Sequence, residues 1–255
     1  MDSDLVPAYF TGLIILAILI LLVVIASRRE KMRIQFLHSL ASRLGLQSYD
    51  KDKSVLPGGL RNIPLYVQGK KRKVMNVMQG TREGALMSIF DFSSRVGQGK
   101  LMIEQVQTVA CFEKEGMNLP GFSMRPVGSY HEIPLEWDYV DVDFSAAHPG
   151  FAKGFAVKGK DEAAVRAMFT EQVIEHYTRI RGIAVEGEGN VLVCFRPGQQ
   201  RRPEDLHAFR DNGGKILLQF MAAAEGAGFV GPVSVAEESA GAELGGEGEG
   251  VSDEG

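Results

Sequence analysis

Residues 9–26 read YFTGLIILAILILLVVIA and lead directly into the charged segment SRREK at 27–31. The apolar stretch holds no charged side chain. A helix from Pro7 to Ser27 would extend about 31 Å, which matches the roughly 30 Å hydrocarbon core of a bilayer. The sequence therefore predicts one transmembrane helix over 9–27, preceded by a short segment at 1–8.

Two other readings of this stretch fit less well. A cleavable signal peptide has a positive start and a short apolar run, whereas this chain starts with Asp2 and Asp4 and carries Arg28 and Arg29 where a cleavage site would lie. A helix buried in a globular core would show polar residues on one face. The stretch shows no such face.

The charges on either side of the stretch predict an orientation. No Lys or Arg precedes it, whereas Arg28, Arg29, Lys31 and Arg33 follow it. Because positive flanks stay on the cytoplasmic side, we expect a single-pass cell-membrane protein with its N-terminus outside and its large C-terminal part in the cytoplasm.

The formal net charge of −4 hides an uneven distribution. All 28 Lys and Arg lie between Arg28 and Lys215, while the segment 225–255 carries only acidic charges and is rich in Gly and Glu. Such a segment cannot bury enough apolar surface to order itself. We therefore expect a disordered acidic C-terminal tail at 225–255.

The region between the apolar stretch and the tail has the patterns of a folded domain. Apolar residues at helical spacing predict a membrane-proximal amphipathic helix at 28–46. Within 47–222, period-two apolar patterns separated by short Gly-containing turns predict an antiparallel β-meander. Asp161 as an N-cap and Pro203 at a first helical position start two helices. The expected strands cover 63–68, 74–79, 86–92, 102–112, 122–125, 139–144, 182–186 and 190–196.

These elements define the expected fold class. It is a single N-terminal transmembrane helix followed by a soluble α+β domain, in which an antiparallel β-meander packs with two to three helices. The disordered acidic tail completes the chain.

No catalytic signature is present, and we expect neither catalytic residues nor a cofactor. The phosphate loop, the dinucleotide fingerprint, HExxH, GxSxG, paired CxxC and the calcium loop are all missing from the sequence. The best acidic group is Asp141, Asp143 and His148. Two carboxylates on one strand face and a nearby imidazole can bind a hard metal ion, but the alternative is an exposed strand face.

Cys111 and Cys194 each lie in an apolar strand pattern, TVACF and VLVCF. Cysteine in such a setting behaves as a small apolar side chain. Neither has a neighbouring pattern that would lower its pKa. We therefore expect no nucleophile.

The clearest surface signal is basic. The run Lys70-Lys71-Arg72-Lys73 falls at an expected hairpin turn, and Arg28, Arg29, Lys31 and Arg33 lie beside the expected bilayer. Together they predict contacts with anionic lipid headgroups. The alternative is a solubilising turn with ordinary flanking charges. Nucleic acid is not expected, because no aromatic side chains alternate with the basic ones.

Several local motifs resemble those of a group of bacterial single-pass membrane proteins with no assigned activity. They are IFDF at 89–92, TVACF at 108–112, LPGF at 119–122, MRP at 124–126, DVDF at 141–144 and HPGF at 148–151. The resemblance covers most of the expected domain. It implies a bacterial membrane-anchored domain and carries no site residue, cofactor or substrate.

The combined expectation is a membrane-tethered binding or scaffold module on the cytoplasmic face, with a protein partner or an anionic lipid surface as its ligand. Two alternatives stay open. One is a membrane-anchored metal-dependent enzyme that uses Asp141, Asp143 and His148, and the other is a structural subunit of an envelope assembly.

Overall fold

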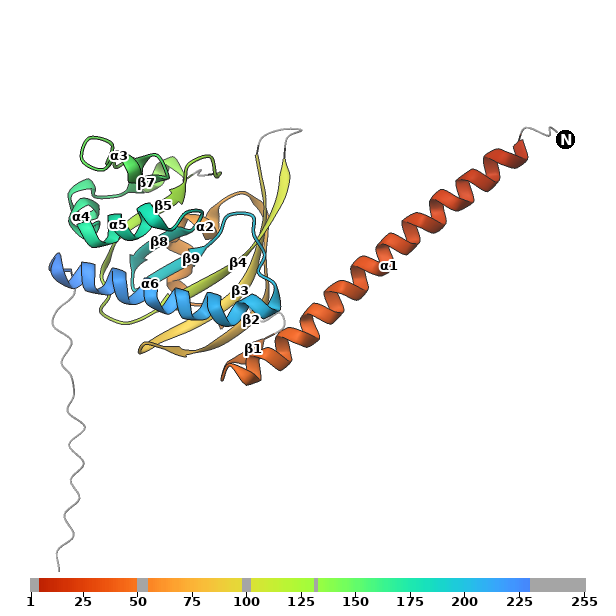
Figure 1. Ribbon diagram of the computed structural model, residues 1–255, viewed down its shortest axis with the longest axis horizontal. Coiled ribbons are helices and arrows are strands. Elements are labelled where there is room, and N and C mark those ends of the chain that lie inside the picture. The colour runs from red at the N-terminus through yellow and green to blue at the C-terminus, as the bar shows by residue number, and fades with distance from the viewer. Residues whose placement is uncertain (1–4, 50–54, 98–101, 131–132, 230–255) are drawn as a thin grey trace, which may run out of the picture.

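A computed structural model of the chain describes residues 5–49, 55–97, 102–130 and 133–229, and shows a long N-terminal helix attached to a domain built on one β-sheet (Figure 1). The nine strands follow the order β1-β2-β3-β4-β9-β8-β5-β7-β6, and every neighbouring pair is antiparallel. The strands are β1 (Gln47–Tyr49), β2 (Lys70–Arg82), β3 (Ala85–Val96), β4 (Ile103–Glu113), β5 (Leu119–Pro126), β6 (Val140–Asp141), β7 (Phe155–Gly159), β8 (Ala184–Gly189) and β9 (Val191–Phe195).

Helices cover both faces of the sheet. The helices are α1 (Leu5–Arg43), α2 (Pro64–Val67), α3 (Pro149–Ala152), α4 (Glu162–Met168), α5 (Glu171–Arg179) and α6 (Leu206–Gly226), with 3-10 turns η1 (Gly58–Asn62), η3 (Leu135–Trp137) and η4 (Pro203–Asp205). Because side chains alternate along each strand, the sheet builds two separate apolar cores. The larger core lies under α4, α5 and α6, and the smaller one lies under η1 and α2.

The expectation of a membrane span does not hold for the part of the chain that the structure describes, where no helix is long and apolar enough to cross a membrane. The predicted transmembrane helix at 9–27, the single-pass topology, the outside N-terminus and the cytoplasmic location are corrected accordingly.

The expected fold class is corrected in its helices as well. The antiparallel sheet is present, but after α1 the described residues form five α-helices instead of the expected two to three. The amphipathic pattern at 28–46 is the C-terminal part of α1, which runs without a break to Arg43 and buries Leu37, Leu40 and Ala41 against the sheet.

Two expected strands and the start of the tail also differ from the structure. A strand was expected at 63–68, but Pro64 begins the helix α2. The proline ring fixes φ at a helical value, and the missing N–H costs nothing because the first helical turn has no partner for it. Only β6 forms within 139–144. The expected tail at 225–255 starts inside α6, which continues to Gly226, and residues 230–255 lie outside the described residues.

The predicted N-cap at Asp161 is present, and Thr170 caps α5 in the same way. The Asp161 side chain accepts from the Ala164 N–H at 3.0 Å, and the Thr170 hydroxyl accepts from the Val173 N–H at 3.4 Å. Gly213 does not interrupt α6. A Cβ there would lie 3.0 Å from Cζ of Phe112, so the glycine allows the helix to approach β4 closely.

Asp91, in the middle of β3, holds α1 on the sheet. Its side chain is 2% exposed and forms a 3.0 Å ion pair with Arg33 of α1. Oδ2 also accepts from Asn76 and Gln200, each at 2.9 Å, and Oδ1 accepts from the Thr108 hydroxyl at 2.7 Å. Asn76 has a positive φ of 56° at an irregularity in the β2–β3 register. The carboxylate of Asp91 thus connects α1, the strands β2, β3 and β4, and the segment that follows β9.

We predict that Asp91→Asn lowers the free energy of unfolding by about 3 kcal/mol, because it leaves the guanidinium of Arg33 without its charged partner in a mostly buried setting. Urea denaturation of the full chain measures this. Asp141→Asn is the matched control, since Asp141 pairs with Lys158 at 2.9 Å but is 79% exposed. It should cost less than about 1 kcal/mol. Equal losses for the two variants would contradict the role given to Asp91.

Candidate functional site: the α2 surface

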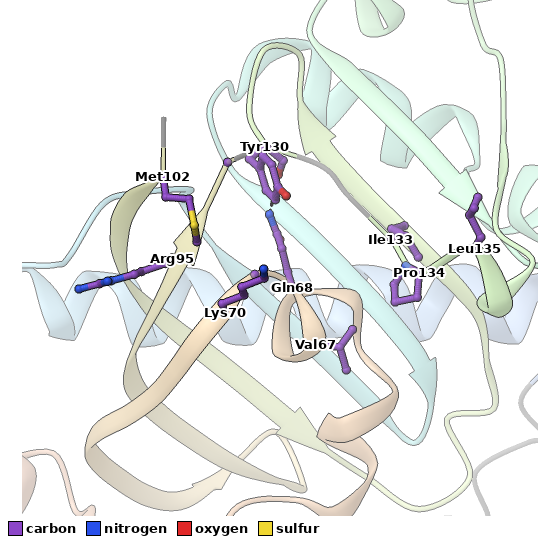
Figure 2. Close-up of a pocket in the computed structure, with 11 residues that line it drawn as sticks. Val67, Gln68, Lys70, Arg95, Met102, Tyr130, Ile133, Pro134 and Leu135 are labelled. Carbon is purple, nitrogen blue, oxygen red and sulfur yellow. Dashed lines mark hydrogen bonds between the residues drawn. The ribbon is translucent and has the colours of Figure 1, made fainter. Parts of the chain in front are cut away.

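A cleft of about 500 Å³ opens beside α2, where β2 begins and β3 ends (Figure 2). One wall comes from α2 and the strand ends, and the other comes from the segment after β5. Figure 2 shows Gln68 pointing from the first wall toward Tyr130 in the second. The lining residues are Val67, Gln68, Gly69, Lys70, Arg95, Gly97, Met102, Tyr130, Ile133, Pro134 and Leu135.

A buried ion pair beneath the cleft fixes its position. Arg125 of β5 is 2% exposed and Glu186 of β8 is fully buried, and the Arg125 Nε donates to Glu186 Oε1 at 2.6 Å. The other carboxylate oxygen accepts from the Leu65 N–H of α2 at 2.7 Å. The Ser123 hydroxyl also donates to this carboxylate at 2.7 Å. Glu186 therefore joins β5, β8 and α2.

The same arginine connects the two walls. Its Nη1 donates to the Tyr130 carbonyl at 2.7 Å and to the side-chain oxygen of Gln68. The amide nitrogen of Gln68 in turn donates to the Tyr130 carbonyl at 3.1 Å. Charge-assisted hydrogen bonds of this kind are stronger and more directional than neutral ones. The cleft is thus preformed by buried polar contacts on both sides.

Gly69 explains how β2 can start at the edge of the cleft. It has a φ of +73°, and a Cβ at this position would lie 2.6 Å from the backbone oxygen of Arg95. Only glycine meets both requirements without strain. The close approach brings the first residue of β2, Lys70, opposite Arg95 in the strand register.

Five cations gather at this corner of the sheet. Lys70, Lys71, Arg72 and Lys73 are the first four residues of β2, and Arg95 faces Lys70 from β3; all five are exposed. Lys71 has a positive φ of 50° at a register irregularity, which locally redirects the strand. In the described part of the chain, none of the five forms an ion pair with a carboxylate. Glu104 of β4 lies opposite Arg95 in the β3–β4 register, and its carboxylate accepts from the Ser93 hydroxyl at 2.8 Å. The charge of the described residues at this corner is therefore net positive.

A second cleft, of about 380 Å³, lies on the other side of Val67. Its apolar wall contains Tyr66, Val74 and Phe92, and its cations are Arg61 and Arg72. The Arg72 Nη1 also donates to the Val67 carbonyl at 2.5 Å, which fixes the side chain against the end of α2. We call the two clefts and the five cations together the α2 surface.

The structure places the expected lipid-contact residues in different settings. Lys70-Lys71-Arg72-Lys73 lies in a strand and not at a hairpin turn, because the turn that joins β2 to β3 comes at Glu83 and Gly84. Arg28 is exposed on α1, whereas Arg33 is held by Asp91. The side chains of Arg29 and Lys31 lie outside the described residues.

The expected metal ligands are not brought together. Asp141 pairs with Lys158, and His148 Nε2 lies 3.6 Å from Glu171. Asp143 accepts from the backbone N–H and the hydroxyl of Ser145, and these hydrogen bonds lower the pKa of its carboxyl. Within the described ranges, no group of three His, Cys, Asp or Glu side chains is arranged to hold a metal ion.

Both cysteines are buried and free, as expected for apolar strand positions. Burial raises the pKa of the Cys194 thiol to about 12, and it raises the pKa of Cys111 as well. Both thiols are therefore protonated at neutral pH, which makes them poor nucleophiles.

We predict that Ellman's reagent at pH 8 leaves both thiols of the native chain unmodified on a timescale of minutes, and that both react at once in guanidinium chloride. The reason is that the reagent requires an exposed thiolate, and folding suppresses both exposure and ionisation. The absorbance of the released thionitrobenzoate measures the extent of reaction. Rapid modification of one equivalent in the native state would contradict the buried placement.

Comparison with known proteins gives a likeness of fold. No protein-family model matches the chain, and no curated protein sequence matches it. Among solved structures, the crystal structure of the mycobacterial trehalose monomycolate transport factor A, TtfA, is similar with a TM-score of 0.53 and 17% sequence identity. The alignment covers 79% of this chain and 97% of that chain. At this identity, the chain is similar to TtfA in its fold.

Proposed function

We propose that this protein is a non-catalytic binding module whose α2 surface takes a lipid with an anionic headgroup. The observation that carries the proposal is the group of five exposed cations, none of which forms an ion pair within the described residues, beside two clefts with apolar walls. The cations match the headgroup of an anionic amphiphile, and the apolar walls match its acyl chain.

The cations favour an anionic ligand because they lie close to one another. Lys70 is directly opposite Arg95 in the β2–β3 register, and like charges at such positions repel. Binding of a phosphate group would offset this repulsion and add charge-assisted hydrogen bonds. Arg72, already held by the Val67 carbonyl, has lost part of its conformational freedom before the ligand arrives.

The apolar walls favour an acyl chain next to the headgroup. Leu135 is 95% exposed, and Val67, Met102 and Ile133 line the same cleft. An exposed leucine alone is ordinary, but several apolar side chains in one concave region are typical of a ligand site. Burial of about 100 Å² of acyl surface there would contribute about 2.5 kcal/mol.

The fold likeness supports the class of ligand. TtfA is named as a trehalose monomycolate transport factor. A shared fold alone does not transfer a ligand. The likeness to TtfA supports an acyl-containing ligand. The preference for an anionic headgroup rests on the cations of this chain.

We predict that Lys70→Glu/Arg95→Glu weakens the binding of dioctanoyl phosphatidylglycerol to the full chain by at least about tenfold, because a basic group near anionic lipid contributes about 1 kcal/mol and each reversal replaces attraction with repulsion. Titration calorimetry measures the affinity. Fluorescence of the single tryptophan, Trp137, gives a second signal because it ends the 3-10 turn that begins at Leu135.

The matched control is Lys153→Glu/Arg43→Glu, which makes the same change in net charge at two exposed positions on other elements. It should bind phosphatidylglycerol within about twofold of the unmodified chain. Dioctanoyl phosphatidylcholine should bind more weakly, and added salt should reduce the difference between the two lipids. Equal affinity for both lipids, or equal weakening by both double variants, would overturn the proposal.

A further inference from the structure

A separate cavity of about 360 Å³ lies between α5, the N-terminal half of α6 and the ends of β8 and β9. Figure 1 shows α5 and α6 on the same face of the sheet, whereas the α2 surface belongs to the opposite core. The floor of the cavity is apolar and includes Tyr177, Phe209 and Ile216. Its volume falls in the range of small-molecule sites.

Three cations line this cavity: Arg196, Arg201 and Lys215. In the part of the chain that the structure describes, none of them forms an ion pair. The one carboxylate in the lining, Asp205, is bound to Arg202 at 3.0 Å. The cavity therefore combines a surplus of positive charge with an apolar floor.

Arg201 is held in place before any ligand binds. Its guanidinium lies over the Phe209 ring, 5.3 Å from the centroid. Its backbone N–H donates to the Thr108 hydroxyl at 2.8 Å, and its carbonyl accepts from Arg33 at 2.7 Å. The backbone contacts connect Arg201 to the hydrogen bonds around Asp91. Its guanidinium is held in place by stacking on Phe209 and not by an acidic side chain.

Two buried polar atoms at this cavity lack a hydrogen-bond partner among the described residues. They are Nε of Arg201 and the hydroxyl of Tyr177. Tyr177 is fully buried, and burial raises the pKa of its hydroxyl, so it is a neutral donor at physiological pH. An unsatisfied buried donor costs about 1–3 kcal/mol, so an acceptor that reaches either atom would stabilise the structure.

From these observations we infer that the cavity between α5 and α6 is a second binding site, which takes an organic carboxylate with an apolar body. Arg201 and Arg196 bind the carboxylate, Lys215 adds a third positive charge, and the apolar body covers Phe209 and Ile216. A guanidinium matches a carboxylate with two parallel hydrogen bonds, which an alcohol of the same size cannot accept. This inference is independent of the α2 surface.

The test is titration of the full chain with octanoate and with 1-octanol. We expect saturable binding of one octanoate per chain and at least about tenfold weaker binding of the alcohol. Arg201→Met keeps the stacking volume on Phe209 but removes the charge, and it should weaken octanoate binding at least about tenfold. Lys153→Met is the matched control, because Lys153 is exposed on another element and lines no part of the cavity.

Thermal unfolding provides a readout besides affinity. Because Arg201→Met removes a partly buried cation with an unsatisfied nitrogen, the ligand-free variant should unfold at the same or a higher temperature than the unmodified chain. Octanoate should raise the unfolding temperature of the unmodified chain and leave that of the variant unchanged. A ligand-free variant that unfolds at a much lower temperature would overturn the role given to Arg201.

A second variant keeps the test independent of folding. Ala208 is exposed at the rim of the cavity, so Ala208→Trp fills the space without a change in the core. It should abolish octanoate binding and leave phosphatidylglycerol binding at the α2 surface unchanged. Absence of saturable octanoate binding, equal binding of octanol, or full binding by both variants would overturn the inference. If Lys70→Glu/Arg95→Glu lost binding of both octanoate and phosphatidylglycerol, the two ligands would share one site, which would also overturn the inference.

Discussion

The ion pair between Arg125 and Glu186 is the constraint on which the α2 side of the molecule depends. Both groups lie in the sheet and are almost completely removed from water. A charge transferred to such an environment is costly unless its partner and its remaining hydrogen bonds are all present. Here the remaining bonds come from α2 and from the segment after β5, so these two elements are fixed by the need to satisfy the pair.

Asp91 has the corresponding role on the other face of the sheet. It lies on the side of the larger core, where it connects α1 with the segment that follows β9. Each face of the sheet thus carries one buried carboxylate. Glu186 lies where α2 meets the strands, and Asp91 lies where the segment after β9 meets them. The apolar cores supply most of the free energy of folding, while the two carboxylates decide which surface segment lies where. Both candidate sites border these segments.

The sequence patterns located most of the sheet but not the charges inside it. Strand periodicity predicted the central strands correctly, because successive side chains of β3 and β4 point to opposite faces of the sheet and contribute to its two cores. No buried role was predicted for Asp91, Arg125 or Glu186 from the sequence. Their partners Arg33, Gln68 and Leu65 lie 57 to 121 residues away along the chain, and no local pattern predicts contacts over such a separation.

Other expectations failed because local signals have more than one physical meaning. The apolar run at 9–26 has the composition of a membrane span, whereas no helix in the described part of the chain is long and apolar enough to cross a membrane. Lys70-Lys71-Arg72-Lys73 follows a glycine and was assigned to a turn, whereas that glycine permits close contact with Arg95 and the strand continues. The cavity between α5 and α6 was not predicted at all, since its walls come from three separate parts of the chain.

The order of strands has a consequence for how the protein is made. β4 and β5 are consecutive along the chain, yet the hairpin of β8 and β9 lies between them in the sheet. The strands β1 to β4 and the strands β5 to β7 can each pair early, but they cannot share one sheet until residues 184–195 have left the ribosome. Until then each part exposes an unpaired edge, which other chains can bind. The last hairpin to be synthesised is thus the one that joins the two halves, and protection from aggregation during synthesis depends on how soon it inserts.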